Sequence, residues 1–308
     1  MCFASNVQLA KHKKLSTIKN TIWYKMTLTQ KIQYNKKSAQ KNNWSPTWFG
    51  CDTFDKKLID NVIAFQKSFD LVADGLVGPM TYRRIFADRE LANPEQKYLF
   101  FCGEKIPIDW SRVVTWQDDP YWSYPKHCYR KVTQRRKIDL FINHWDVALT
   151  SRSCHKILKR RNLSAHLYIS EEGHIIQTCD LNWICYHAGN VNARSIGVEV
   201  NNAYYPDKYQ KYYVKNGFGA RPIITNAIVH GKKLPPFMGF YEVQLKALRA
   251  VWSCVSKYCD IPLKGPDTTT VYQPAIDGNW RGICSHFHVS RHKIDVAGLD
   301  INQQISLI

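Results

Sequence analysis

The residues best suited to chemistry gather near the end of the chain, where His286, His288, Lys293 and Asp295 lie close together. Imidazole nitrogen and carboxylate oxygen are good ligands for Zn²⁺, and a catalytic zinc site uses three protein ligands and leaves one position open. One more ligand must therefore come from elsewhere. His144 is the natural candidate, because it ends an apolar segment that has the character of a buried strand. The cluster alone leaves a surface patch open as the alternative to a metal site.

These side chains need a framework, and the hydrophobic pattern predicts one that mixes strands with helices. Residues 139–144 and 195–200 are expected to be buried strands, and residues 171–173 are expected to form the turn of a hairpin that ends in glycine. A helix with one apolar face is expected over residues 242–259. Strands mixed with long helices indicate an α/β domain, which we place at residues 136–308.

The residues before this domain divide into three segments by composition. Residues 1–45 contain nine lysines and no acidic residue, and we expect a basic flexible arm there. Residues 46–88 have apolar residues at helical spacing, and we expect a small helical domain. Residues 89–135 are rich in proline and aromatic residues, and we expect an aromatic-rich linker that packs on the second domain.

Composition limits the partners and the cellular setting of the protein. The net charge of +18 predicts an anionic partner, which nucleic acid, acidic lipid and acidic cell-wall polymer would all satisfy. No apolar run is long enough for a transmembrane helix, and the first residues lack the apolar core of a secretory signal. The ten cysteines are scattered without a CxxC pair, so we expect most of them to be reduced and buried.

Residues 46–88 resemble the peptidoglycan-binding domain family, which is a small three-helix bundle. The resemblance is carried by Phe65-Gln66, Leu71, Asp74-Gly75, Val77-Gly78-Pro79 and Thr81. Asp74-Gly75 is a turn signal, because glycine adopts positive φ at no steric cost. Pro79 suits the first turn of a helix, where its missing N–H is not needed. The resemblance implies a peptidoglycan-binding helical domain at residues 46–88.

Residues 137–300 resemble the zinc-dependent N-acetylmuramoyl-L-alanine amidases, a family that includes phage lysozymes, bacterial recycling amidases and peptidoglycan recognition proteins. The matching stretches occur in the family's order: FINH at 141–144, LSAHLYIS at 163–170, HAG at 187–189, NARSIGVE at 192–199, and His286 followed by Lys293-Ile294-Asp295. The fold that this implies is a mixed β-sheet flanked by helices, with a zinc cleft.

The resemblance also implies roles for individual side chains. It implies that His144, His286 and Asp295 hold Zn²⁺, that Glu199 is the general acid and base, and that Lys293 stabilises the transition state. His288 stays open as a rival ligand, because the spacing from His286 to Asp295 is shorter than in the recycling branch. Cys284 and Asp300 are more distant rivals. The substrate cleft is expected to include His187, Asn192 and Trp145.

The activity that the resemblance implies is hydrolysis of the amide between N-acetylmuramic acid and L-alanine in bacterial peptidoglycan, by a zinc-activated water. Together with a wall-binding domain and no export signal, this resembles a monomeric phage endolysin. Such a bacteriolytic enzyme would accumulate in the host cytoplasm and reach the cell wall after release. The alternatives are a metallopeptidase that cuts the stem peptide and a non-catalytic peptidoglycan-recognition protein. No recognition module accompanies the positive charge, so nucleic acid is not the expected partner.

Overall fold

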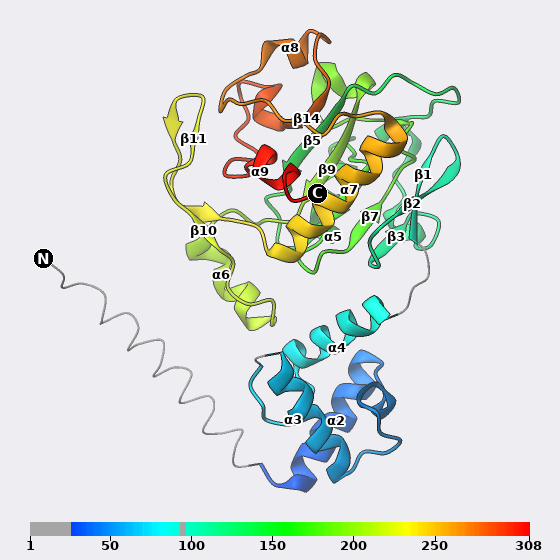
Figure 1. Ribbon diagram of the computed structural model, residues 1–308, viewed down its shortest axis with the longest axis vertical. Coiled ribbons are helices and arrows are strands. Elements are labelled where there is room, and N and C mark those ends of the chain that lie inside the picture. Colours follow the sequence, from blue (N-terminus) through cyan, green and yellow to red (C-terminus); the bar gives the residue numbers. More distant parts are fainter. Residues whose placement is uncertain (1–25, 70, 93–96) are drawn as a thin grey trace, which may run out of the picture. The chain divides into compact units, whose positions relative to one another are not determined.

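The computed structural model describes residues 26–69, 71–92 and 97–308. The chain divides into two compact units, the first within Met1–Asn93 and the second within Pro94–Ile308 (Figure 1). Within the described residues, no helix combines the length and the apolar character that crossing a membrane requires.

The first unit is helical, as the sequence predicts. Its elements are α2 (Leu28–Asn42), the short 3₁₀ helix η1 (Pro46–Phe49), α3 (Lys56–Ser68) and α4 (Pro79–Ala92). Leu58 and Val62 of the predicted apolar stripe on α3 are fully buried. They join one core with Ala39, Trp44, Phe49, Cys51, Val77 and Ile85.

The prediction of a flexible arm is wrong for residues 28–42, which form α2. The helix begins with a capping box, in which the Thr27 hydroxyl accepts from the Gln30 N–H and the Gln30 side chain accepts from the Thr27 N–H. Residues 1–25 of the predicted arm lie outside the described residues.

Asn35 explains why the hydrophobic pattern does not reveal α2. Asn35 and Ala39 are the buried residues of this helix. The Asn35 side chain donates to the Gly75 carbonyl at 3.0 Å and accepts from the Val77 N–H at 2.8 Å. A helix that docks through an amide has no apolar stripe for a periodicity argument to detect.

The side chain of Gln66 contacts several residues of the predicted turn, which explains why they occur together in the motif. Its side-chain oxygen accepts from the Gly75 N–H at 2.8 Å. Its side-chain nitrogen lies 3.0 Å from the Leu76 carbonyl and 2.9 Å from the Thr81 hydroxyl. Gln66 is buried, so these partners satisfy a group whose burial would otherwise be costly. The spaced motif therefore fixes the loop between α3 and α4.

The second unit is built on a six-stranded mixed sheet in the order β14-β5-β9-β6-β7-β3. Neighbouring strands from β14 to β6 are parallel, β6 and β7 form the predicted antiparallel hairpin, and β3 runs parallel to β7. The strands are β3 (Val113–Thr115), β5 (Leu140–Trp145), β6 (Leu167–Ile169), β7 (Ile175–Gln177), β9 (Ser195–Val200) and β14 (Gly282–Ser285).

The two faces of this sheet are covered by different helices. The long helix α7 (Glu242–Cys259), which crosses in front of the sheet in Figure 1, packs against one face. The helix α5 (Ser151–Arg160) contributes Cys154 and Leu158 to a separate core cluster that contains Tyr168 of β6. The α/β prediction for this domain is confirmed.

The alternation along β9 determines which of its residues are available to a site. Ile196, Val198 and Val200 belong to the core cluster beneath α7. Because successive side chains of a strand point to opposite faces, the intervening residues point away from α7. These residues are Ser195, Gly197 and Glu199.

Residues 97–135 pack within the second unit, as expected, but they form regular elements rather than an irregular linker. They form the hairpin of β1 (Lys97–Phe101) and β2 (Glu104–Ile108), the edge strand β3, the 3₁₀ helices η2 (Pro120–Trp122) and η3 (Lys126–Cys128), and β4 (Tyr129–Arg130). The Gln177 side chain holds the hairpin, because it accepts from the Phe100 N–H at 2.7 Å and donates to the Phe100 carbonyl at 2.8 Å.

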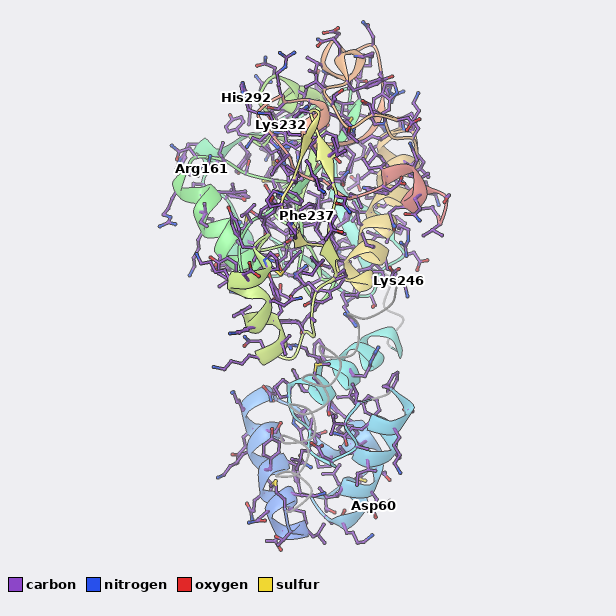
Figure 2. The ribbon with its side chains drawn as sticks, turned by 90° about the vertical axis from the view of Figure 1, so that its left-hand side faces the viewer. Asp60, Arg161, Lys232, Phe237, Lys246 and His292 are labelled. Carbon is purple, nitrogen blue, oxygen red and sulfur yellow. The ribbon has the colours of Figure 1, made fainter. Side chains whose placement is uncertain are left out.

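The segment between β9 and α7 adds a small subdomain. It contains α6 (Pro206–Lys215) and two short ladders, β10 (Ile223–Ile224) with β13 (Phe237–Met238) and β11 (Ile228–Val229) with β12 (Lys232–Lys233). Phe237, labelled in Figure 2, packs against Trp145 at a ring distance of 5.2 Å. The remaining elements are β8 (Ile184–Cys185), η4 (Gly189–Arg194), α8 (Gln273–Ile276), η5 (His286–His288) and α9 (Ile301–Ile305).

The described cysteines are free thiols, and all except Cys102 are buried. The buried ones are dispersed over several core clusters, such as Cys51 in the helical unit, Cys254 on the buried face of α7 and Cys284 in β14. Burial raises the pKa of the Cys254 thiol to about 12, which suppresses the reactive thiolate. The burial of these residues agrees with the prediction that most of the cysteines are buried.

His155 of α5 lies in an aromatic cage and is expected to make the stability of the second unit pH-dependent. Its ring centroid is 4.4 Å from that of Tyr124, and its Nε2 lies 3.2 Å from the Tyr121 carbonyl. Burial, helped by the nearby Lys159 cation, lowers the pKa of His155 from 6.5 to about 4. The stabilising contribution of this neutral imidazole is complete above pH 6.5 and is lost as the pH falls toward 4.

A His155→Gln variant retains a donor to the Tyr121 carbonyl but does not titrate. We expect the wild type's stability advantage over this variant to shrink by about 2 kcal/mol between pH 8 and pH 5. Denaturant unfolding of both proteins at the two pH values measures this difference. An advantage that is the same at both pH values would contradict the assignment of His155 as a buried neutral imidazole.

Candidate active site

The ends of three strands bring the predicted residues together. His144 lies opposite Glu199 in the parallel pairing of β5 with β9. Side chains in register on neighbouring strands point to the same face. His286 follows directly after β14, the neighbour of β5 on the other side. The carboxyl ends of parallel strands meet at one edge of a sheet, where α/β proteins place their sites.

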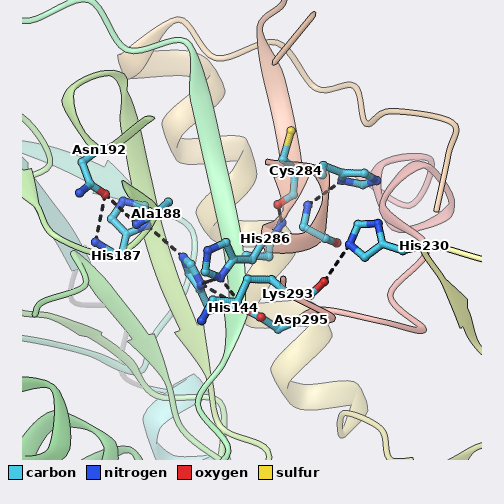
Figure 3. A network of polar contacts seen from close by, with 12 residues as sticks. His144, His187, Ala188, Asn192, His230, Cys284, His286, Lys293 and Asp295 are labelled. Atoms are coloured by element: carbon cyan, nitrogen blue, oxygen red, sulfur yellow. Dashed lines mark hydrogen bonds and ion pairs between the residues drawn. The ribbon is translucent and has the colours of Figure 1, made fainter. Parts of the chain in front are cut away.

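Three potential ligand atoms converge at this edge (Figure 3). Nδ1 of His144 lies 2.9 Å from Nδ1 of His286 and 3.2 Å from Oδ2 of Asp295, and the distance from His286 Nδ1 to this oxygen is 2.9 Å. Within the described residues, this is the one group of three or more His, Cys, Asp or Glu side chains whose ligand atoms lie within 4.8 Å of one another. The structure thus brings the three predicted ligands together.

The spacing and the donor types of this triad fit a zinc ion. Ligand atoms bonded to one ion at about 2.0–2.1 Å in tetrahedral geometry lie roughly 3.4 Å apart, which is a few tenths of an ångström more than the distances here. Two imidazoles with one carboxylate are also a donor set that zinc uses in catalytic sites. All three residues are buried, with exposed fractions between 3% and 8%.

The protonation states of the triad also suit metal binding. Burial and the neighbouring His286 lower the pKa of His144 to about 4, so its imidazole is neutral near pH 7. Burial alone would raise the pKa of Asp295, but hydrogen bonds to His144 and His286 hold it below its usual value. Metal ligands must be deprotonated to bind, and both groups meet this requirement at neutral pH.

The rival ligands have other partners. His288 turns away from the triad: its Nδ1 accepts from the Ser285 N–H at 3.0 Å, and its Nε2 lies 2.8 Å from the Thr268 carbonyl. Cys284 is packed in a core cluster with Leu140 and Ile142. Asp300 caps α9, where its side chain accepts from the Gln303 N–H at 2.9 Å.

A cavity of about 230 Å³ opens beside the triad. Glu199 and Lys293, the two residues predicted to act in catalysis, both line it. Burial raises the pKa of Glu199 well above its usual value, and the nearby carboxylates of Asp146 and Asp295 raise it further. A carboxylate of raised pKa is a strong proton acceptor that can also return the proton, which is what a general acid and base requires.

The three predicted substrate-binding residues have different surroundings. His187 lines the cavity, but its ring also contacts His144 and Ser195. Trp145 lines the cavity too, although it is only 6% exposed. Its ring packs against Tyr204 and Phe237, which leaves little of it for stacking on a substrate.

The side chain of Asn192 is occupied within a turn rather than being free in the cavity. Its carbonyl oxygen accepts from the His187 N–H at 3.0 Å and from the Ala188 N–H at 2.7 Å (Figure 3). It is not among the residues that line the cavity. Asn192 therefore shapes the loop that carries His187.

The residues that α5 and its end contribute to the cavity were not predicted from the sequence. Ile157, Arg161 and Tyr186 line the cavity together with the strand ends. Arg161 is the C-cap of α5. The helix itself was predictable, but its residues carry no local signal that they face the site, because only the packing of α5 on the sheet brings them there.

Comparison with known proteins agrees with this arrangement. The profile of the N-acetylmuramoyl-L-alanine amidase family matches residues 134–297, which contain the triad, Glu199 and Lys293. No curated protein matches this sequence.

Several solved structures are similar to parts of this chain. The endolysin N-acetylmuramoyl-L-alanine amidase LysCS from Clostridium intestinale is 15% identical, with 63% of this chain and 93% of that chain covered and a TM-score of 0.34. AmiD from E. coli, solved with an anhydro-N-acetylmuramic acid peptide, is 18% identical, with 44% and 49% covered and a TM-score of 0.29. Drosophila peptidoglycan recognition protein SA is 13% identical, with 56% and 79% covered and a TM-score of 0.30. Because the family profile spans more than half of the 308 residues, this chain belongs to the N-acetylmuramoyl-L-alanine amidase family.

Proposed function

We propose that the protein is a zinc-dependent N-acetylmuramoyl-L-alanine amidase, which hydrolyses the amide between the lactyl group of N-acetylmuramic acid and L-alanine in bacterial peptidoglycan. The observation that carries this proposal is the convergence of Nδ1 of His144, Nδ1 of His286 and Oδ2 of Asp295 within 3.2 Å of one another. They converge beside a buried carboxyl group, in a chain of the amidase family.

Each residue at the cavity has its own role in the proposed reaction. His144, His286 and Asp295 would hold the zinc ion, which when bound acidifies water and polarises a carbonyl oxygen. Glu199 takes the proton of the attacking water and later delivers a proton to the leaving amine nitrogen of L-alanine. The Lys293 ammonium, at the cavity, stabilises the negative charge that develops on the carbonyl oxygen.

Digestion of purified peptidoglycan, followed by mass analysis of the fragments, tests the reaction. We expect free stem peptides that begin with L-alanine, together with glycan strands that carry unsubstituted lactyl carboxyl groups. Cuts within the stem peptide would instead support the metallopeptidase alternative. Binding to peptidoglycan without any release of fragments would support a non-catalytic recognition protein.

The role of Lys293 can be separated from metal binding by a Lys293→Met variant. We expect kcat to fall by about 10²–10³, since removal of one oxyanion donor has this effect in other hydrolases. Zinc content should stay unchanged, because Lys293 is not one of the converging ligands. Lys246→Met is the matched control, because Lys246 is exposed on α7 and does not line the cavity (Figure 2). Loss of zinc from Lys293→Met would contradict the assigned role.

We further propose that the protein is a phage endolysin whose helical unit attaches it to the cell wall. Between α3 and α4 this unit has a mainly apolar groove of about 380 Å³, lined by Tyr34, Leu71 and Met80 among others. A wall-binding unit raises the local concentration of an insoluble substrate at the active site. The net charge of +18 also favours an anionic wall.

Deletion of the helical unit tests this attachment. A chain of residues 94–308 should lose activity on intact cell walls and keep its activity on soluble muropeptides. Equal activity of both chains on intact walls would contradict a wall-binding role of the helical unit.

A further inference from the structure

The ring of His187 contacts Nε2 of His144, the ring nitrogen that is not directed at the other two ligands. Nε2 of His144 lies 2.9 Å from Nδ1 of His187, and the two rings are nearly perpendicular, with an interplanar angle of 88°. On its far side, Nε2 of His187 lies 3.2 Å from the Ser195 hydroxyl. The three side chains thus form a continuous chain of polar contacts that leads away from the triad, and Figure 3 shows its first step, from His144 to His187.

The chemistry of imidazole fixes the direction of these hydrogen bonds once a metal is bound. A neutral imidazole has one protonated and one unprotonated nitrogen. When Nδ1 of His144 serves as a ligand, its single proton must be on Nε2, where His187 Nδ1 is the acceptor. His187 must then carry its own proton on Nε2, and it donates this proton to the Ser195 hydroxyl.

The strand β9 is built to hold the His187 ring in this place. A Cβ atom on Gly197 would come within 2.6 Å of Cε1 and 2.7 Å of Cγ of His187, so the ring lies directly over this glycine. Ser195, two residues earlier on the same face, supplies the hydroxyl partner. Glu199, two residues later, lines the cavity. In the Ser-Ile-Gly-Val-Glu stretch, the serine thus provides a hydrogen-bond partner for His187, and the glycine leaves the space that the His187 ring occupies.

The loop that carries His187 is also fixed at its backbone. The Asn192 side chain accepts from the backbone N–H groups of His187 and Ala188 at 3.0 Å and 2.7 Å. The ring, its hydroxyl partner and its backbone are therefore all held by residues of one short stretch, 187–197.

We propose that His187 is a positioning residue of the metal site, which accepts the Nε2 proton of His144 and so holds the tautomer whose Nδ1 lone pair faces the metal. This inference rests on the proposed zinc-dependent function. Outer partners of metal-bound histidines typically contribute 10–100-fold to metal affinity. In this assignment His187 acts on the substrate only through His144.

Zinc affinity of the full chain, measured by competition with a chromogenic chelator, tests the proposal. We expect His187→Leu to weaken zinc binding by about 10–100-fold. His187→Asn should retain most of the affinity, because its side-chain oxygen occupies the place of Nδ1. Gly197→Ala should weaken binding as His187→Leu does, since it displaces the ring, and the double variant should lose little more. His127→Leu is the matched control, because His127 is exposed.

A second measurement needs no substitution and applies even if His187→Leu fails to fold. Long-range ¹H–¹⁵N correlation spectra of the zinc-loaded wild type should show both His144 and His187 protonated at Nε2. Protonation of His187 at Nδ1 would overturn the proposal.

The outcomes separate this inference from the proposed function. If the wild type binds zinc and releases stem peptides while His187→Leu binds zinc equally well, the positioning role alone is wrong. If His187→Asn is as weak as His187→Leu, the ring is needed for packing rather than as an acceptor, and the proposal is also overturned. A wild type that binds no zinc would overturn both the inference and the proposed function.

Discussion

Replacement of Glu199 by glutamine is expected to leave zinc bound and to reduce kcat by about 10²–10⁴. The amide has the size of the carboxyl group but cannot take a proton from water or return one to the amine. Because Glu199 is not one of the three converging ligands, the metal site should stay intact. Release of stem peptides from peptidoglycan, measured together with zinc content, gives both quantities.

The same substitution is expected to leave the metal-free protein at least as stable as the wild type. Burial and the neighbouring carboxylates disfavour the charged form of Glu199, and this is what raises its pKa. A neutral amide removes this cost, so thermal unfolding should occur at the same or a higher temperature. Glu104→Gln, on an exposed position of β2, is the control for both measurements. Near-full activity of Glu199→Gln would show that another group moves the proton.

Replacement of Asp295 by asparagine is expected to have the largest effect on metal binding. It removes the one anionic ligand of the triad and leaves two neutral imidazoles and an amide. We expect zinc affinity to fall by more than the roughly 10–100-fold that loss of an outer partner causes. Activity should fall in parallel and recover in part when zinc is supplied in excess.

Asp300→Asn provides a matched control for this experiment. Asp300 was a rival ligand in the sequence analysis, but the structure uses it to cap α9. Asparagine is as good a cap as aspartate, so this variant should match the wild type in zinc affinity, activity and stability. Unchanged zinc affinity in Asp295→Asn would remove Asp295 from the metal site.

The type of site could be predicted from the sequence, but not the identity of every residue in it. His144 was predictable because a histidine at the end of an apolar strand is held at the edge of a sheet. The choice between His286 and His288 could not be made from spacing. It is made by η5, the single turn that directs the His288 ring back to the Ser285 N–H. The other nitrogen of the His288 ring contacts the Thr268 carbonyl, 20 residues earlier in the sequence, and spacing within the motif does not reveal this contact.

The parts of the fold that the sequence analysis missed depend on contacts with distant residues. The edge strand β3 is three residues long and gains its place only by pairing with β7, about sixty residues later. The hairpin of β1 and β2 is attached through the side chain of Gln177 and through apolar residues such as Leu99 and Ile108, which join the core beneath α7. The short strand β3 has no local signal of its own, whereas the apolar run of β1 and the alternating Ile106 and Ile108 of β2 are a local signal that the prediction of a linker did not use.

The amide contacts of Asn35 have a consequence for how accurately the helical unit assembles. Apolar packing tolerates a helix that slides or rotates, because such contacts have no direction. A buried amide is satisfied in one position only, and displacement of α2 by one residue would leave both the Asn35 amide and the Val77 N–H without partners. We therefore expect the Asn35 contacts to fix the position of α2 in its unit rather than to add much to the stability of the unit. A single polar residue has the same effect when it sets the register of a coiled coil.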